Sequence, residues 1–305
     1  MPELPEVEFA RRSLVRWFDG RALVNAEADK KARTFRGAKP ADFDSLRGAL
    51  QKAERRGKYL MLTFSDGHGV VAHLGMTGKF VKRAAGVAEP YSRAKLFLDS
   101  GEVIHFRDPR LFGRIEPMRN DQLATNAVIM ALGADPLVDG LSGAQLKGRV
   151  GPSKQDLKVA LMDQSRVAGL GNIHAAEALY RAKLHPARKP GTLSHVEWAA
   201  LAKAIHASIV FALKTESGND EIVYVEEGEG DNPFFVYGRK GEPCTKCKTA
   251  IAHFDQGGRS TFYCPHCQPA PKGFKQPKAA LTKRAVKQKA PVAKAKAGTA
   301  RRSRR

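Results

Sequence analysis

The first twenty residues carry an apolar stripe with the spacing of a helix. Pro5 suits a first helical turn, where no amide donor is needed, and Gly20 suits the end of a helix. The spacing predicts a helix between these two residues that buries one face against the rest of the chain. The apolar positions on that face are Val7, Ala10, Leu14, Trp17 and Phe18.

Strand-like runs follow this helix and are separated by Gly and Asp turns. Such a succession indicates an antiparallel sandwich or barrel. We assign residues 1–118 to a β-sandwich domain with a flanking helix. The predicted strands cover residues 59–64, 69–73, 96–98, 103–106 and 114–117.

The pattern changes after residue 118, where helical spacing prevails. We expect a helical domain over 119–215, an acidic, glycine-rich loop over 216–235, a cysteine-containing hairpin over 236–268 and a tail over 269–305. The predicted fold class is therefore α+β with several domains. The predicted helices cover residues 121–132, 142–148, 157–162, 173–182 and 195–215.

The chain of 305 residues has a formal net charge of +21, which predicts a polyanionic partner. Residues 271–305 hold thirteen Lys or Arg and no Asp or Glu, so the rest of the chain carries +8. This tail has too few large apolar residues to form a core, and we expect it to be disordered. It is either a solubilising extension or a mobile arm that increases affinity for nucleic acid, and we favour the arm.

No run of apolar residues approaches the length of a membrane span, and the acidic, Pro-rich N-terminus is unlike a secretory signal. The only cysteines form two pairs, which suits a reducing compartment better than a disulfide framework. We therefore expect a cytosolic protein without a membrane partner.

The four cysteines stand as Cys244-x2-Cys247 and Cys264-x2-Cys267, with sixteen residues between the pairs. This spacing predicts one tetrahedral zinc site, and the zinc would be structural because four thiolates close its coordination. The spacer has room for a β-hairpin with Arg259 at its tip, after two glycines. Such a hairpin either only stabilises its domain or presents Arg259 to a phosphate.

The N-terminus holds a second candidate site. Removal of Met1 would leave Pro2 with a secondary amine, whose pKa near about 8 leaves part of it neutral at pH 7. A neutral amine can attack a sugar carbon that bears a base. Glu3 and Glu6 follow closely and can donate or accept protons. The same residues also suit an ordinary acidic start of a helix.

The run Pro2-Glu3-Leu4-Pro5-Glu6-Val7-Glu8, together with the cysteine hairpin, resembles the formamidopyrimidine-DNA glycosylase/endonuclease VIII family of DNA repair enzymes. The resemblance covers residues 2–268, nearly everything except the tail. It implies an N-terminal β-sandwich, a helix–two-turn–helix domain and a C-terminal β-hairpin zinc finger, with DNA in the cleft between the domains.

The resemblance also implies catalytic roles. Pro2 is the expected Schiff-base nucleophile, Glu3 the acid/base that acts on the sugar ring, and Glu6 a supporting carboxylate that orders the nucleophile. Lys58 matches a β-strand lysine that approaches the DNA at the lesion, whereas residue type alone would make it an exposed strand lysine.

A base that is flipped out of the duplex leaves a gap. The family fills this gap with side chains that match Met76, Arg110 and Phe112, and His73 matches a phosphate contact. By residue type alone, Met76 and Phe112 would be core residues. The set resembles the branch that removes oxidised purines, although Leu111 departs from the basic residue often found there.

Asn172 follows Gly169-Leu170-Gly171 at the start of a predicted helix. The resemblance implies that Asn172 and Arg259 hold the phosphates that flank the lesion, and a helix cap is a compatible role for Asn172. Lys154 lies nearby and is expected to add a phosphate contact. His174 stands where tyrosine is usual, which leaves that backbone contact open.

We therefore expect a bifunctional DNA glycosylase and lyase of base excision repair. It would remove oxidised purines through a Schiff base on Pro2, followed by β- and δ-elimination. Its expected partner is damaged double-stranded DNA, and we expect a monomer in the bacterial cytoplasm, associated with the nucleoid. The alternatives are an oxidised-pyrimidine glycosylase and a noncatalytic zinc-containing DNA-binding protein. The acidic loop leaves the lesion preference open.

Overall fold

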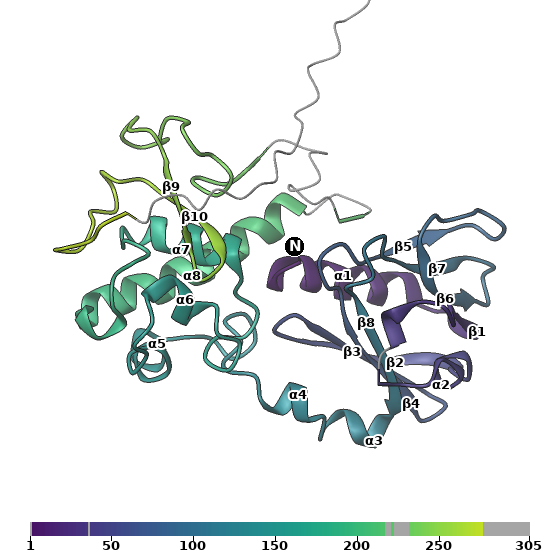
Figure 1. The fold of residues 1–305 in the computed structure, drawn as a ribbon. Helices are drawn as coiled ribbons and strands as arrows, with labels where there is room; N and C mark the ends of the chain where they lie inside the picture. The colour runs from purple at the N-terminus through teal and green to yellow at the C-terminus, as the bar shows by residue number, and fades with distance from the viewer. Residues whose placement is uncertain (1, 36, 217–220, 223–231, 277–305) are drawn as a thin grey trace, which may run out of the picture.

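The computed structural model describes residues 2–35, 37–216, 221–222 and 232–276. They form a β-rich domain and a helical domain with the N-terminus between them (Figure 1). The predicted acidic loop and the predicted tail lie largely outside the described residues.

The β-rich domain begins with the predicted helix, which is confirmed and ends before Gly20 in a left-handed conformation (φ 66°). Strands follow, with a short 3-10 turn and a short helix among them. The elements are α1 (Leu4–Phe18), β1 (Ala22–Ala28), η1 (Arg33–Phe35), α2 (Pro40–Asp44), β2 (Gly48–Arg56), β3 (Tyr59–Phe64), β4 (His68–His73), β5 (Lys79–Arg83), β6 (Ser92–Leu98), β7 (Val103–Arg107) and β8 (Arg114–Arg119).

The strands pair in the order β5-β7-β6-β1-β2-β3-β4-β8. β1 and β2 pair at only two positions, so the sheet divides there into two four-stranded halves. Side chains from both halves and from α1, such as Leu62, Leu96 and Leu14, meet in one core. This is the packing of a β-sandwich, and the predicted fold class is confirmed.

The apolar pattern did not predict three of these strands, β1, β2 and β5. β2 has few large apolar residues and carries Lys52, Glu54 and Arg56. It forms because β3 pairs with it from Leu50 opposite Phe64 to Arg56 opposite Tyr59. Tertiary pairing therefore decides its conformation more than its own sequence does.

The helical domain is built around α7 and α8. Its core includes Leu179 of α7 together with Trp198, Leu201 and Ile205 of α8. After β8 the chain first forms α3 (Asn120–Leu123), which contacts β3, β4 and β8 of the sandwich. The helices that follow are α4 (Ala127–Met130), α5 (Gly143–Val150), α6 (Leu157–Leu161), α7 (Asn172–Arg181), η2 (Pro190–Thr192) and α8 (His195–Glu216).

Two expectations for this part of the chain need correction. The helix predicted over 121–132 is wrong, because the Asn126 side chain accepts hydrogen bonds from the amides of Val128 and Ile129 and so starts α4 as a separate helix. One segment, His195–Thr215, is long and apolar enough to cross a membrane by length and composition alone. In this structure α8 is the central helix, and its apolar residues pack against α1, α5 and α7.

The cysteine hairpin consists of β9 (Ala252–Gln256) and β10 (Arg259–Tyr263) and lies beside α7 (Figure 1). The carboxylate of Glu177, which is buried in α7, accepts hydrogen bonds from the amides of Phe235, Val236 and Tyr237 at 2.9–3.1 Å. These bonds fix the chain that leads into the hairpin.

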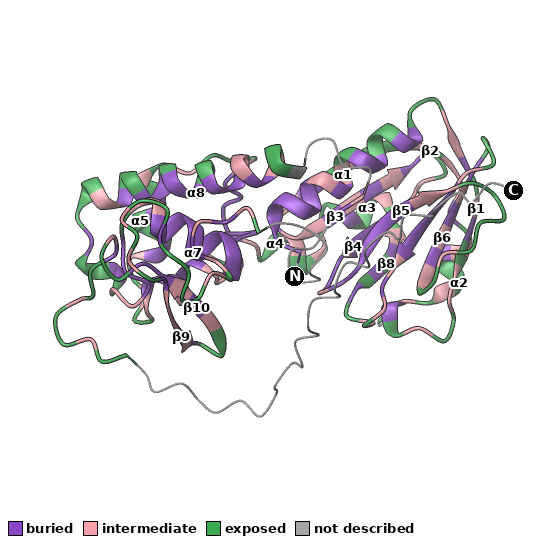
Figure 2. Cartoon of the chain, turned by 90° about the horizontal axis from the view of Figure 1, so that it is seen from above, coloured by how far each residue is buried: buried purple, intermediate pink, exposed green. Residues whose placement is uncertain are grey.

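The two domains exchange side chains. Leu4 of α1 packs in the core of the helical domain, and its amide donates to the Gly169 carbonyl at 3.1 Å. In the other direction, Ile222 packs in the sandwich core. α1 and α8 also contact each other and lie along one side of the molecule (Figure 2). The N-terminus is thereby fixed at the domain junction.

Candidate active site

Glu3 caps a helix of the opposite domain. Its Oε1 accepts the Ile173 amide at 2.8 Å, and its Oε2 accepts the amides of Gly171 and His174 at 2.9 and 3.1 Å. The positive end of a helix favours such a carboxylate. These amides lie at the start of α7. Glu3 therefore places the residue before it, Pro2, at the junction of the two domains.

Glu6 supports this arrangement from the first turn of α1. Its Oε2 accepts the Glu3 amide at 2.8 Å, which is one half of a capping box. Burial raises the pKa of Glu6, and Glu3 adds to this rise while His174 opposes it. Glu6 can therefore hold a proton close to Pro2, which is itself buried.

Lys58 approaches Glu3 from the sandwich domain. It lies in the Gly57-Lys58 turn between β2 and β3, and not on a strand as predicted. A β-carbon on Gly171 would lie 2.4 Å from Glu3 Oε1 and 2.7 Å from Lys58 Nζ, so only glycine leaves room for this pair. Burial lowers the pKa of Lys58, the charge of Glu3 opposes this, and Arg259 lowers it further.

His73, at the end of β4, contacts Tyr59 with the rings tilted by 52° and their centroids 4.8 Å apart. Its Nδ1 accepts the Gly75 amide at 3.0 Å. Burial, with the charges of Lys58 and Arg114, lowers the pKa of His73 to about 4. The ring is therefore neutral at pH 7, and because Nδ1 is the acceptor, Nε2 carries the proton and is the donor.

Asp108 joins the two loops that carry the predicted gap-filling residues. This buried carboxylate accepts the Thr77 hydroxyl at 2.7 Å, the Gly113 amide at 2.7 Å and the Arg110 amide at 3.3 Å. A β-carbon on Gly75 would lie 2.4 Å from the backbone of Phe112, so the loops are in direct contact. Sequence reasoning missed Asp108, although Asp before Pro109 is a common turn signal.

Two of the three residues predicted to fill the gap, Arg110 and Phe112, are exposed. Phe112 is 52 % exposed, so it is not a core residue, and the Arg110 guanidinium lies 5.1 Å from the centre of its ring. Met76 is half-buried in the neighbouring turn. Leu111 has a left-handed backbone (φ 56°), which turns the chain sharply between Arg110 and Phe112. The structure thus brings the three predicted residues together.

Asn172 lies between α6 and the cysteine hairpin. Its Nδ2 donates to the Ser260 carbonyl at 3.0 Å, and its Oδ1 accepts from Lys158 Nζ. Lys158 is buried and also donates to Thr261 Oγ1 at 2.9 Å. Sequence reasoning missed this lysine, because it lies in the apolar run of α6 and resembles a solvated helix residue.

The neighbouring predicted residues have different positions. Arg259 is exposed at the tip of the hairpin, directly before Ser260, and its charge reaches both Lys58 and Lys158. Lys154 is exposed in the irregular segment between α5 and α6, where its carbonyl accepts from Lys189 Nζ at 3.3 Å.

His174 points into the protein. It is fully buried, its Nδ1 lies 2.9 Å from Ser208 Oγ, and its ring contacts Phe234 edge-on at 6.0 Å. The backbone contact left open for this position is therefore not available to His174. The buried His174 ring instead lies close enough to Glu6 to counteract part of the rise in the Glu6 pKa.

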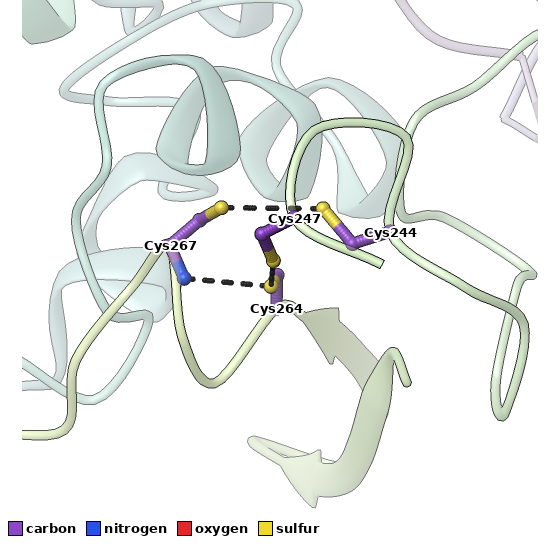
Figure 3. Close-up of side chains that lie close together, drawn as sticks. All are labelled: Cys244, Cys247, Cys264 and Cys267. Atoms are coloured by element: carbon purple, nitrogen blue, oxygen red, sulfur yellow. Dashed lines mark hydrogen bonds between the residues drawn. The ribbon is translucent and has the colours of Figure 1, made fainter. Parts of the chain in front are cut away.

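The four cysteines lie together at the base of the hairpin (Figure 3). All four sulfurs are within 4.8 Å of one another, with Cys244–Cys267 at 4.0 Å and Cys247–Cys264 at 3.4 Å. Zn–S bonds of about 2.3 Å in a tetrahedron place sulfurs about 3.8 Å apart, so the group fits one zinc ion. The predicted structural zinc site is confirmed, and the Tyr180 hydroxyl lies 3.2 Å from the Cys244 sulfur.

Comparison with known proteins agrees with this geometry. Three family models match: the formamidopyrimidine-DNA glycosylase N-terminal domain over residues 1–115, the formamidopyrimidine-DNA glycosylase H2TH domain over residues 132–222, and the zinc finger found in FPG and IleRS over residues 241–270. A formamidopyrimidine-DNA glycosylase of Desulfitobacterium hafniense is 38 % identical over 280 residues, which cover 88 % of this chain and all of that protein.

Solved structures give the same result. The MutM (Fpg) protein of Thermus thermophilus is 32 % identical, with a TM-score of 0.74 over 88 % of this chain and 98 % of that one. Lactococcus lactis Fpg complexes with FAPY-dG DNA and with oxidised-pyrimidine DNA are both 28 % identical, with TM-scores of 0.78 over 88 % of this chain and all of theirs. This chain therefore belongs to the formamidopyrimidine-DNA glycosylase family.

Proposed function

We propose that this protein is a bifunctional DNA glycosylase and abasic-site lyase that removes oxidised bases from duplex DNA. The observation that carries this proposal is the position of Glu3. Its carboxylate is fixed on the amides that open α7, so Pro2 before it stands where the two domains meet. Lys58 reaches the same point from the sandwich.

The chemistry starts once Met1 has been removed. The Pro2 nitrogen attacks C1′ of the damaged nucleotide, the bond to the base breaks, and the base leaves with a proton. The Glu3 carboxylate takes up the proton that the Pro2 nitrogen loses and delivers it to the ring oxygen as the sugar ring opens to an iminium ion. β-Elimination followed by δ-elimination releases both phosphates and leaves a one-nucleotide gap. Glu6 holds the N-terminal turn in place through the Glu3 amide.

DNA would be held from both domains. Asn172 and Arg259 contact the phosphates beside the lesion, and the neutral His73 and the amine of Lys58 contact the backbone on the sandwich side. Met76, Arg110 and Phe112 fill the gap left by the flipped nucleotide. Lys158 is buried and bonded to Asn172, whereas Lys154 is exposed. These positions support Lys158, and not Lys154, as the lysine that orients the phosphate-binding side chain.

Oxidised purines are the proposed substrates, since the Met76, Arg110 and Phe112 set resembles that branch of the family. A second candidate, oxidised pyrimidines, is favoured by the Lactococcus lactis Fpg complex with oxidised-pyrimidine DNA. We infer further that the protein acts as a monomer on damaged DNA in the bacterial cytoplasm, associated with the nucleoid.

Borohydride trapping tests the proposal. Processed protein should form a covalent adduct with duplexes that carry 8-oxoguanine, formamidopyrimidine or an abasic site, and Pro2→Gly should trap far less. Base release from these duplexes and from a thymine glycol duplex, measured side by side, separates the two substrate classes. Binding without trapping on any of them would favour a noncatalytic DNA-binding protein.

A further inference from the structure

A buried ion pair joins the two domains next to the candidate site. The side chains of Arg55, at the end of β2, and Asp135, in the segment before α5, are 1 % and 0 % exposed. Arg55 donates to both carboxylate oxygens of Asp135, at 2.5 and 3.0 Å, and its Nε donates to Glu8 of α1 at 3.2 Å. One guanidinium is therefore shared by a carboxylate from each domain.

The same carboxylate also binds the turn that carries Lys58. Asp135 Oδ2 accepts the Gly57 amide at 2.8 Å, and Arg55 Nη1 donates to the Gly57 carbonyl at 3.0 Å. Gly57 has a left-handed backbone (φ 57°), and a β-carbon there would lie 3.1 Å from the Ala168 side chain. Both peptide groups around Gly57 are thus held by this ion pair, one residue before Lys58.

Asp135 is itself held rigidly. Its Oδ1 accepts the amides of Leu137 and Val138 at 3.0 and 3.2 Å, and its own amide donates to Asp139 at 2.9 Å. Asp139 in turn pairs with Arg56 at 2.7 Å, in a partly exposed position. Asp135 and Asp139 thus each pair with an arginine directly before the Gly57-Lys58 turn. Of these two pairs, only the Asp135 pair is buried and bonded to the backbone of the turn.

We propose that Asp135 is a positioning residue of the reaction, because it holds the turn that aims Lys58 at Glu3. The inference rests on the role proposed for Lys58. Loss of the Asp135 charge would leave Arg55 buried beside Glu8 alone and would free the Gly57 amide. Lys58 would then gain water and mobility, although the strands on both sides of it stay paired.

Asp135→Asn and Asp139→Asn form a matched pair for testing, since each removes one charge from the same segment and keeps an amide-bonding oxygen. We expect Asp135→Asn to lower single-turnover excision of 8-oxoguanine about tenfold or more, because small displacements of a reacting group are costly. Its affinity for a duplex with a stable abasic-site analogue should change less than about threefold. Asp139→Asn should stay within about twofold in both, since its ion pair is partly exposed.

Titration of Lys58 gives a readout that does not depend on activity. In protein labelled with [ε-13C]lysine, with Lys58→Arg used to assign the signal, Asp135→Asn should move the Lys58 midpoint upward, and Asp139→Asn should not. An unchanged midpoint in folded Asp135→Asn overturns the inference even if excision falls, as does equal loss of excision in both variants. A wild-type protein that never traps DNA would instead refute the proposed function, and the titration would still decide the role of Asp135.

Discussion

Lys158 donates a hydrogen bond to the side-chain oxygen of Asn172 from a position that solvent does not reach. Burial lowers the pKa of Lys158 to about 7, while Glu3 opposes this shift and Arg259 adds to it. The same amine bonds Thr261, so one nitrogen connects α6, α7 and the zinc hairpin. It also sets the orientation of the Asn172 amide, whose second N–H hydrogen is then directed away from Ser260.

Lys158→Met should weaken binding to a duplex that contains an abasic-site analogue about tenfold, because Asn172 loses the charged donor that orients it. The melting temperature should not fall, since methionine fills a similar volume without a buried amine. Fluorescence anisotropy and thermal unfolding measure the two effects. Lys154→Met is the comparison, and a larger loss of affinity there would restore the sequence-based assignment.

Arg259→Ala should also reduce affinity for damaged duplex about tenfold, because an exposed phosphate contact at the hairpin tip is removed. The zinc ligands lie at the base of the hairpin, so metal analysis should still find one zinc per chain. Zinc loss in this variant would mean that Arg259 stabilises the hairpin and that its effect on DNA is indirect.

Phe112→Ala should lower excision of 8-oxoguanine about tenfold or more while thermal stability stays nearly unchanged, since the ring is half exposed and would be needed only in the DNA gap. Tyr91→Ala is a matched control, because this aromatic ring is 53 % exposed and also has an arginine, Arg93, over its face. If both variants lose excision equally, the wedge assignment for Phe112 is wrong.

Glu6 gives a pH dependence whose sign can be worked out. Its folded-state pKa lies above the ordinary value of 4.5, so the native state binds more protons than the unfolded state between the two values. Stability therefore falls as pH rises through this window. Glu6→Gln keeps an acceptor for the Glu3 amide and should be more stable than wild type at pH 8, a gain that shrinks toward pH 4. Unfolding measured across pH 4–8 tests this, and trapping should be impaired throughout.

Truncation after Gln276 tests the basic tail. It removes eleven Lys or Arg but keeps the docked part of the C-terminus, in which Phe274 contacts His185 at 4.6 Å and Gln276 bonds the His253 carbonyl. Affinity should fall and its dependence on salt should become less steep, while single-turnover excision at saturating protein is retained. An unchanged salt dependence would rule out the arm and leave the solubilising role.

Much of the site was predictable because its signals are local. The cysteine spacing is enough to specify the zinc site, and the apolar stripe after Pro5 specifies α1. The roles expected of Met76, Arg110 and Phe112 came from the family resemblance, which rests on short motifs around turns. None of these inferences needed to know which segments meet in space.

The residues that were missed have their roles only through tertiary contacts. Asp108, Asp135 and Lys158 bond to partners that lie 31, 80 and 103 residues away along the chain. In the sequence they resemble a turn aspartate, a loop aspartate and a solvated lysine. β2 was missed for a different reason, since its own apolar pattern is weak and its strand conformation depends on pairing with the adjacent β3.

The fixed position of Glu3 on α7 has a consequence for how the enzyme matures. Pro2 directly precedes this anchored residue, so any residue before it turns the proposed nucleophile into an amide. The freshly translated chain would be a DNA-binding protein without activity, and methionine aminopeptidase would switch it on. An affinity tag on the N-terminus would keep the Pro2 nitrogen in this amide form and should abolish borohydride trapping.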